Sequence, residues 1–167
     1  MCEVFMSDKY NKMNLIRTDL VDTATDVFWE DVSQLTKEAA TRPLLVLVKT
    51  YAPGSADGSQ LQKMLDACGL KQEQYHIIQM SEDEKASWPG LREQLDPKVI
   101  FLIGVMPAQL GISALFQAHV ANNFNDRIWL PTLSLAELEQ QPAIKKQLWT
   151  GGMKPVFVDR KELGIGN

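Results

Sequence analysis

Apolar residues in the first 41 positions recur at intervals of three and four, the spacing of one face of an amphipathic helix. The recurring positions are Leu15, Ile16, Leu20, Val27, Phe28, Val32 and Leu35. The pattern predicts one or two helices between residues 9 and 40. This N-terminal helical region, residues 1–41, ends before Pro43, because a proline disfavours helical geometry in the residue that precedes it.

Three apolar runs after that point predict buried strands. Residues 44–48 are apolar at every position, as expected of a strand that is covered on both faces. Residues 75–80 and 97–104 also have strand character, and the acidic stretch 82–95 between them is helix-like. An alternation of strands and helices implies parallel pairing.

Capping residues mark the first helix of this core. Ser59 is suited to open a helix over residues 60–68, since its hydroxyl can accept a hydrogen bond from a free backbone amide. Gly69 is suited to end it, because a helix often closes in a left-handed residue. A second, short helix is expected around residues 107–110.

The last part of the chain has the clearest helix signals. Ser134 and Glu137 form the signature of a capping box, and Pro142 suits the first turn of a second helix. Gly151-Gly152 is expected to end that helix. The tail, residues 153–167, is expected to be loosely ordered.

These elements predict one α/β domain over residues 1–167. The α/β core covers residues 42–152, and residues 127–130 form its fourth strand, which ends at Pro131. Residues 112–126 fit a strand, a helix or a loop equally well. We therefore expect a three-layer α/β/α architecture around a four-stranded, mostly parallel sheet.

Composition narrows the class of protein. The 167 residues are 45% hydrophobic and 23% charged, which is ordinary for a globular domain of this length. No apolar run approaches the ~20 residues that span a bilayer, and the first residues lack the features of a signal peptide. We expect a cytoplasmic protein with no membrane association. The net charge of −4 argues against a surface that attracts nucleic acid everywhere, although a local basic groove stays open.

Cysteines and histidines are too few and too scattered for a metal site. Cys2 and Cys68 are far apart in the sequence, and neither His76 nor His119 lies near them at ligand spacing. We predict no metal and no cofactor. Cys68 falls on the apolar side of its helix, which indicates a buried structural thiol. His119 is expected to be hydrogen-bonded or exposed, and His76 to lie at a strand edge.

Tryptophans could stack on bases, but their apolar neighbours favour packing inside the protein. The chain contains Trp29, Trp88, Trp129 and Trp149. Trp88 is the expected exception, because Ser87 and Pro89 flank it.

A ligand site in an open parallel sheet lies beyond the carboxyl ends of the strands. The side chains expected there include neither a histidine base nor a paired carboxylate, so general acid–base chemistry has few candidates. They are Tyr51, Ser55, Asp57, Ser59, Ser81, Thr132 and Ser134. The loop 54–58 could bind an anion through its backbone amides, but a plain turn with Asp57 as a cap is the simpler interpretation.

The order of several motifs resembles the uracil-DNA glycosylase fold, especially its iron-sulfur branch. The motifs are Thr50-Tyr51-Ala52-Pro53-Gly54, Cys68-Gly69-Leu70, the strand entering Gly104 with Pro107-Ala108-Gln109, and Leu130-Pro131-Thr132 with Leu138, Pro142, Lys145 and Trp149. The resemblance covers residues 42–152. It implies a binding pocket formed by Tyr51, Ala52, Pro53, Gly54, Asp57, Gln79, Pro131, Thr132 and Ser134, with Gln79 at the position that reads the base.

Departures from this family fall on its working residues. Tyr51 stands where the family has the acid that aids hydrolysis, and Leu130 stands where it has the histidine that stabilises the departing uracil anion. Losing one such donor typically reduces the rate by about a hundredfold or more. Two isolated cysteines cannot replace the four that hold the cluster, so no iron-sulfur cluster is predicted. The resemblance therefore implies a degenerate site with no catalytic residues.

A second resemblance fits these losses. The segment from Leu130 to Trp149 is similar to the late segment of the psi subunit of the bacterial DNA polymerase III clamp loader. That resemblance implies a protein-interaction subunit in DNA replication or repair, with clamp-loader subunits as partners and residues 1–14 as the docking segment by position. Binding of DNA stays open.

Two alternatives stay open. The chain could be a divergent glycosylase for uracil or another damaged base, in which Asp57 or Ser55 acts on water. It could also be a small-molecule-binding or nucleotide-binding α/β protein unrelated to DNA, because a fold alone does not determine function.

Overall fold

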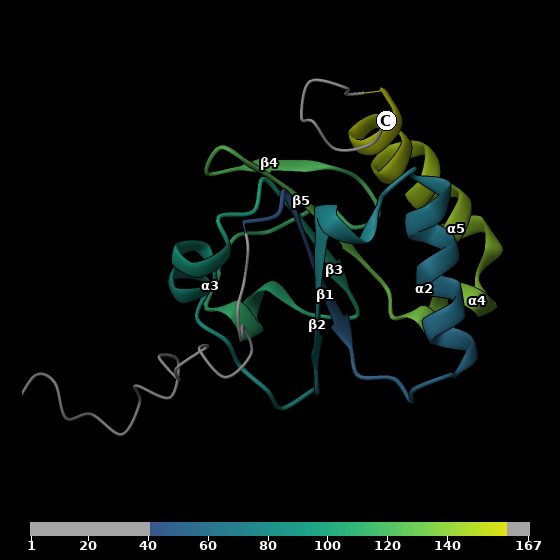
Figure 1. Ribbon diagram of the computed structural model, residues 1–167, viewed down its shortest axis with the longest axis horizontal. Coiled ribbons are helices and arrows are strands. Elements are labelled where there is room, and N and C mark those ends of the chain that lie inside the picture. The colour runs from purple at the N-terminus through teal and green to yellow at the C-terminus, as the bar shows by residue number, and fades with distance from the viewer. Residues whose placement is uncertain (1–40, 160–167) are drawn as a thin grey trace, which may run out of the picture.

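The structure is a computed structural model that describes residues 41–159. The helices predicted between residues 9 and 40 lie outside this range, as do Cys2, Trp29, the proposed docking segment 1–14 and residues 160–167. Figure 1 shows a twisted sheet with helices packed against it.

Five strands form the sheet, in the order β2-β1-β3-β5-β4. Neighbouring strands are parallel except β4, which runs antiparallel to β5. The strands are β1 (Leu44–Lys49), β2 (Tyr75–Met80), β3 (Val99–Ile103), β4 (Asn122–Phe124) and β5 (Arg127–Thr132). The four predicted strands and their parallel pairing are confirmed, although β5 continues through Pro131 to Thr132.

The expected count of four strands is wrong, because β4 adds a fifth. Its sequence, Asn122-Asn123-Phe124, contains two residues that strands disfavour and therefore carries no strand signal. Asn125 and Asp126 join β4 to β5 with φ angles of 50° and 58°. Two positive φ values are typical of the tight turns that join antiparallel strands, and Asn and Asp tolerate them better than most residues.

Helices cover the sheet through two separate clusters of buried apolar residues. Val46, Val48 and Phe101 face the larger cluster, to which α2 (Ala56–Ala67), α4 (Leu135–Gln140) and α5 (Pro142–Leu148) contribute. Leu45, Leu47 and Trp129 face the other cluster, which α3 (Trp88–Leu95) and the 3₁₀ turn Pro107–Leu110 complete. Figure 1 shows α2, α4 and α5 on one side of the strands and α3 on the other.

Helix α2 begins at Ala56, four residues before the predicted start. Ser55 is its N-cap, and its side chain accepts a hydrogen bond from the Gly58 amide (3.4 Å). Ser59, the predicted cap, instead donates to the Ser55 carbonyl (3.4 Å), as a serine inside a helix does. The predicted stop is confirmed, since Gly69 follows the helix with a φ of 71°.

Helix α3 is shorter than the acidic stretch suggested. It begins at Trp88, with Ser87 as the N-cap, so residues 82–87 are not helical. The Gln109 side chain holds this segment by donating to the carbonyls of Ser81 and Glu84 (both 3.0 Å). The charged residues between positions 82 and 87 are therefore not sufficient to extend α3 toward the N-terminus. The predicted short helix is confirmed over residues 107–110.

The capping box before α4 and the proline start of α5 are both confirmed. The predicted end of α5 is wrong, because the chain passes through Gly151-Gly152 as a π-helix that spans Trp149–Asp159. The expected loose tail is also not found in residues 153–159, since Met153, Val156 and Phe157 are buried. Within the described residues, no helix is long and apolar enough to cross a membrane.

Candidate functional site

The carboxyl ends of the parallel strands meet at one edge of the sheet, which we call the sheet edge. Backbone hydrogen bonds from the Thr50 amide to Met80 O (3.0 Å) and from the Gly104 amide to Thr132 O (3.1 Å) extend the pairing past the strand ends. The loop after β1, which carries Tyr51, is thereby held to the end of β2, and Gly104 after β3 is held to Thr132 at the end of β5. The sequence placed its candidate ligand site at this edge.

Tyr51 and Gln79, predicted to share a pocket, are in contact. The Tyr51 amide donates to Gln79 Oε1 (3.2 Å), which joins the loop after β1 to the end of β2. The Tyr51 ring lies against Gly58 in the first turn of α2, where an added Cβ would be 3.1 Å from the ring. Gln79 thus uses its side-chain carbonyl to position the loop, and the residue is exposed.

Leu130 presents nothing to the sheet edge. Its side chain is fully buried in the larger apolar cluster, in register with Phe101 on β3. Gly152 lies so close that an added Cβ there would overlap Leu130 Cδ1. The position that resembles the family's histidine is therefore part of the core.

A histidine does reach the sheet edge, from a different part of the chain. The Nδ1 atom of His119 lies 2.9 Å from Thr132 Oγ1, and the His119 amide donates to Pro131 O (2.8 Å). Partial burial lowers the pKa of this imidazole, which favours its neutral form. The predicted hydrogen bond is confirmed, but the sequence did not place His119 in the site. Nothing in the spacing of residues 119 and 132 indicates their contact.

Ser134 and Lys49 flank Gly104. A Cβ added at Gly104 would lie 2.8 Å from the Ser134 Cβ and 3.3 Å from the Lys49 Cβ, and Gly104 has a φ of 69°. The Ser134 hydroxyl donates to Glu137 Oε2 (2.6 Å) within the capping box. Lys49 pairs with Glu82, and this hydrogen bond raises the pKa of Lys49 and lowers that of Glu82. Most polar side chains at the sheet edge are therefore engaged with one another.

The loop from Ala52 to Gly54 is a plain exposed turn. The Ser55 amide donates to Ala52 O (3.1 Å), and Gly54 has a φ of 72° with open space around it. Asp57, expected to cap a helix here, does not do so, because Ser55 takes that role. Asp57 instead lines a groove beside α2, and none of the other predicted pocket residues lines that groove.

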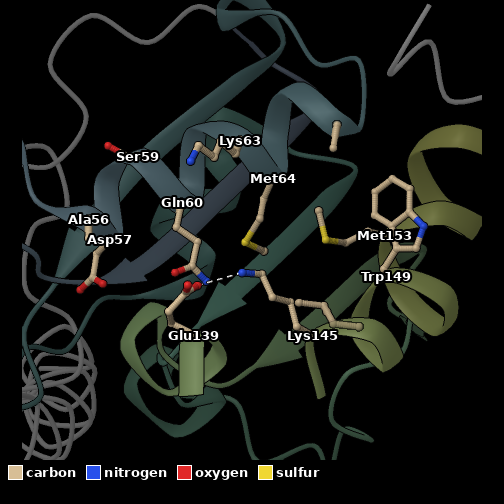
Figure 2. A pocket seen from close by; sticks show the side chains of 12 residues that line it. Ala56, Asp57, Ser59, Gln60, Lys63, Met64, Glu139, Lys145, Trp149 and Met153 are labelled. Atoms are coloured by element: carbon tan, nitrogen blue, oxygen red, sulfur yellow. Dashed lines mark hydrogen bonds and ion pairs between the residues drawn. The ribbon is translucent and has the colours of Figure 1, made fainter. Parts of the chain in front are cut away.

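That groove has a volume of about 490 Å³ and lies between α2 and the segment α4, α5 and Trp149–Asp159. Figure 2 shows residues of α2 on one wall and those of α4, α5 and the π-helix on the other. Its lining residues are Ala56, Asp57, Ser59, Gln60, Lys63, Met64, Ala67, Glu139, Lys145, Leu148, Trp149 and Met153. This groove could not be predicted from the sequence, because helix patterning predicts a covered face and not a gap beside it.

The remaining candidates have structural roles. Cys68 is a free, buried thiol, as predicted, and burial raises its pKa to about 12. Trp88, expected to be exposed, is buried with its ring centroid 4.7 Å from that of Trp129, so that prediction is wrong. His76 lies in the edge strand β2, as expected. Among residues 41–159, no three His, Cys, Asp or Glu side chains are grouped so that they could hold a metal ion.

Comparison with models of protein families finds no match, and a search among curated proteins finds none either. The geometry of the sheet edge and the residues that occupy it are therefore the basis for the function proposed below.

Proposed function

We propose that this chain is a catalytically degenerate protein of the uracil-DNA glycosylase fold, with a three-layer α/β/α architecture. Its role is that of a protein-interaction subunit in DNA replication or repair. The motifs at residues 50–54, 68–70 and 130–132 support the family by their order along the chain; they lie after β1, just after α2 and at the end of β5.

The proposed loss of hydrolytic activity is supported by one observation, the environment of the two residues at the family's catalytic positions. Leu130 is fully buried against Gly152 in the core, and Tyr51 is held by Gln79 and Gly58 at the sheet edge. Neither residue can supply the charge that the two positions provide in the family, since a phenol is not a carboxylate and an alkyl group has no donor. In this proposal both catalytic contributions are therefore missing, while the turn after β1 is retained.

The most specific form of the proposal is a psi-like subunit of a clamp loader. The order of residues from Leu130 to Trp149 supports it, and in this segment β5 is followed by α4 and then by α5, which begins at Pro142. Residues 1–14 would provide the docking segment. A protein whose site lacks catalytic groups but keeps its scaffold is suited to a role in which binding to partners is the function.

Association with purified clamp-loader subunits of the same organism tests the proposal. The full-length chain should co-elute with them in size-exclusion chromatography, and a synthetic peptide of residues 1–14 should compete. A scrambled peptide of the same composition is the control and should not compete. Separate elution of the chain and all clamp-loader subunits at micromolar concentrations would contradict the psi-like role.

A second candidate function is favoured by the His119–Thr132 pair. A neutral imidazole at the carboxyl end of β5 could donate a hydrogen bond to a leaving base, which is the contribution that Leu130 lacks. The two groups expected to act on water have other places in the structure, since Asp57 lines the separate groove and Ser55 caps α2. A divergent glycosylase would therefore depend on His119, and loss of base excision in a His119→Ala variant would support this alternative.

A further inference from the structure

The groove beside α2 contains a buried polar group without a partner. Gln60 is only 8% exposed, and no described residue offers a hydrogen-bond acceptor to its Nε2 atom. Figure 2 shows the Gln60 side chain extending from α2 into the groove, toward Glu139 and Lys145. A buried donor that lacks an acceptor is unfavourable, so such groups are normally paired with protein, water or ligand.

Neighbouring polar groups are already paired with each other. Lys145 Nζ donates to Glu139 Oε2 (2.9 Å), and this interaction lowers the pKa of the Glu139 carboxyl group. Glu139 therefore stays ionised near neutral pH and retains its own partner. A hydrogen-bond acceptor brought in by a bound molecule could satisfy the Gln60 amide without disturbing this pair.

The rest of the groove is suited to apolar atoms. Met64, Leu148 and Met153 are buried, and Trp149 is half-buried beside them. In Figure 2 the side chains of Met64, Met153 and Trp149 line the same end of the groove. Methionine thioethers and an indole ring are polarisable and adapt well to flat or irregular apolar groups.

The side chains that line the groove have a net charge of zero, because the two acids Asp57 and Glu139 balance the two bases Lys63 and Lys145. A charged ligand would lose its hydration without a net opposite charge to replace it. An uncharged acceptor such as an amide carbonyl avoids this loss. The volume of about 490 Å³ falls in the range of sites for small molecules.

We propose that this groove is a binding site for a small uncharged molecule that joins a carbonyl acceptor to a flat apolar body. The carbonyl oxygen accepts a hydrogen bond from Gln60 Nε2, and the apolar body contacts Met64, Met153 and Trp149. The site lies apart from the sheet edge and does not depend on the proposed function.

Three probes of similar shape test this chemistry. Benzamide has the carbonyl and the ring, toluene has the ring without an acceptor, and benzoate carries a charge. We expect benzamide, in the millimolar range typical of molecules this small, to shift the methyl NMR signals of Met64 and Met153 and the indole signal of Trp149 in a saturable way. Toluene should bind about three- to tenfold more weakly, because it lacks the hydrogen bond. Benzoate should also bind more weakly than benzamide.

Two methionine substitutions separate the hydrogen bond from the shape of the groove. Gln60→Met should bind benzamide and toluene equally well, and its melting temperature should rise because a buried unpaired donor has been removed. Gln62→Met is the matched control, because Gln62 lies on the exposed side of the same helix and donates to Asp66. It should keep the preference for benzamide and should not become more stable.

Several results would overturn the proposal. One is the absence of saturable shifts with benzamide, which would mean that water or another part of the chain fills the groove. The others are a preference for benzamide that survives in Gln60→Met, tighter binding of benzoate, and a lower melting temperature of Gln60→Met. The last result would mean that the Gln60 amide already has a partner in the folded protein.

Discussion

The side chain of Leu130 on β5 lies directly against Gly152 of the π-helix. An added Cβ at residue 152 would overlap Leu130 Cδ1. We expect Gly152→Ala to lower the free energy of unfolding by about 1–3 kcal/mol, because the added methyl overpacks the core. Urea denaturation of the purified variants measures this loss.

A double-mutant cycle with Leu130→Val isolates the contact. Valine lacks the Cδ1 atom, so Gly152→Ala should be less destabilising in the Leu130→Val background than in the natural protein. Equal losses in the two backgrounds would show that the two residues do not interact. The cycle thus tests whether Leu130, which stands where the resembling family has its histidine, faces the core.

Gly104 and Gly69 form a matched pair for a test of the sheet edge. Both have a positive φ, of 69° and 71°, but only Gly104 faces neighbours that a Cβ would meet. Gly69→Ala should be destabilised by about 1–2 kcal/mol from the strained backbone alone. Gly104→Ala should be destabilised by about 2–5 kcal/mol, because it also clashes with Ser134. Similar losses in the two variants would contradict the close approach of Ser134 to Gly104.

Much of the fold could be predicted because buried parallel strands have a continuous apolar sequence. Residues 44–48 and 99–103 are apolar at every position and belong to β1 and β3, two interior strands of the sheet. Strand β4 could not be predicted, since it is three residues long and two of them are asparagines. Its existence depends on pairing with β5, which is a tertiary effect that local patterning does not contain.

The candidate site could be predicted only in part. Tyr51 and Gln79 meet as expected because they end neighbouring strands, so topology alone brings them together. His119 could not be placed, because a turn before β4 brings it to Thr132 and the sequence gives no sign of that turn. Gly151 and Gly152 indicated a helix end, but here their missing side chains allow a helix to pass close to Val120 and Leu130.

Burial of His119 predicts a pH effect on stability. Because burial lowers the pKa of His119 in the folded state, the unfolded chain binds a proton first as the pH falls below about 6.5. The contribution of a neutral His119 is therefore complete above that pH and is lost as the pH falls through its folded pKa. We expect the NMR titration of the His119 imidazole to have a midpoint below 6.5.

His119→Asn is the control for this effect, since asparagine also tolerates the positive φ of 63° at this position. Its free energy of unfolding should fall less steeply than that of the natural protein as the pH decreases from neutrality toward 5. A midpoint above 6.5 for His119, or equal pH dependence of the two proteins, would contradict the assigned burial.

The thiol of Cys68 should be unreactive in the folded protein. Burial raises its pKa to about 12, so at pH 8 almost no thiolate is present, and the side chain is only 4% exposed. Iodoacetamide followed by mass spectrometry of peptides should show no modification of Cys68 in the folded chain and rapid modification in urea. Rapid modification of Cys68 without denaturant would show that the thiol is not buried in the larger apolar cluster.

Uracil excision from a single-stranded oligonucleotide tests most directly whether the sheet edge has lost its hydrolytic function. With the purified full-length chain in excess over the oligonucleotide, we predict no more excision than in a control without protein. The account would be contradicted by excision that is abolished by Thr132→Val or His119→Ala, because these substitutions alter only residues of the sheet edge.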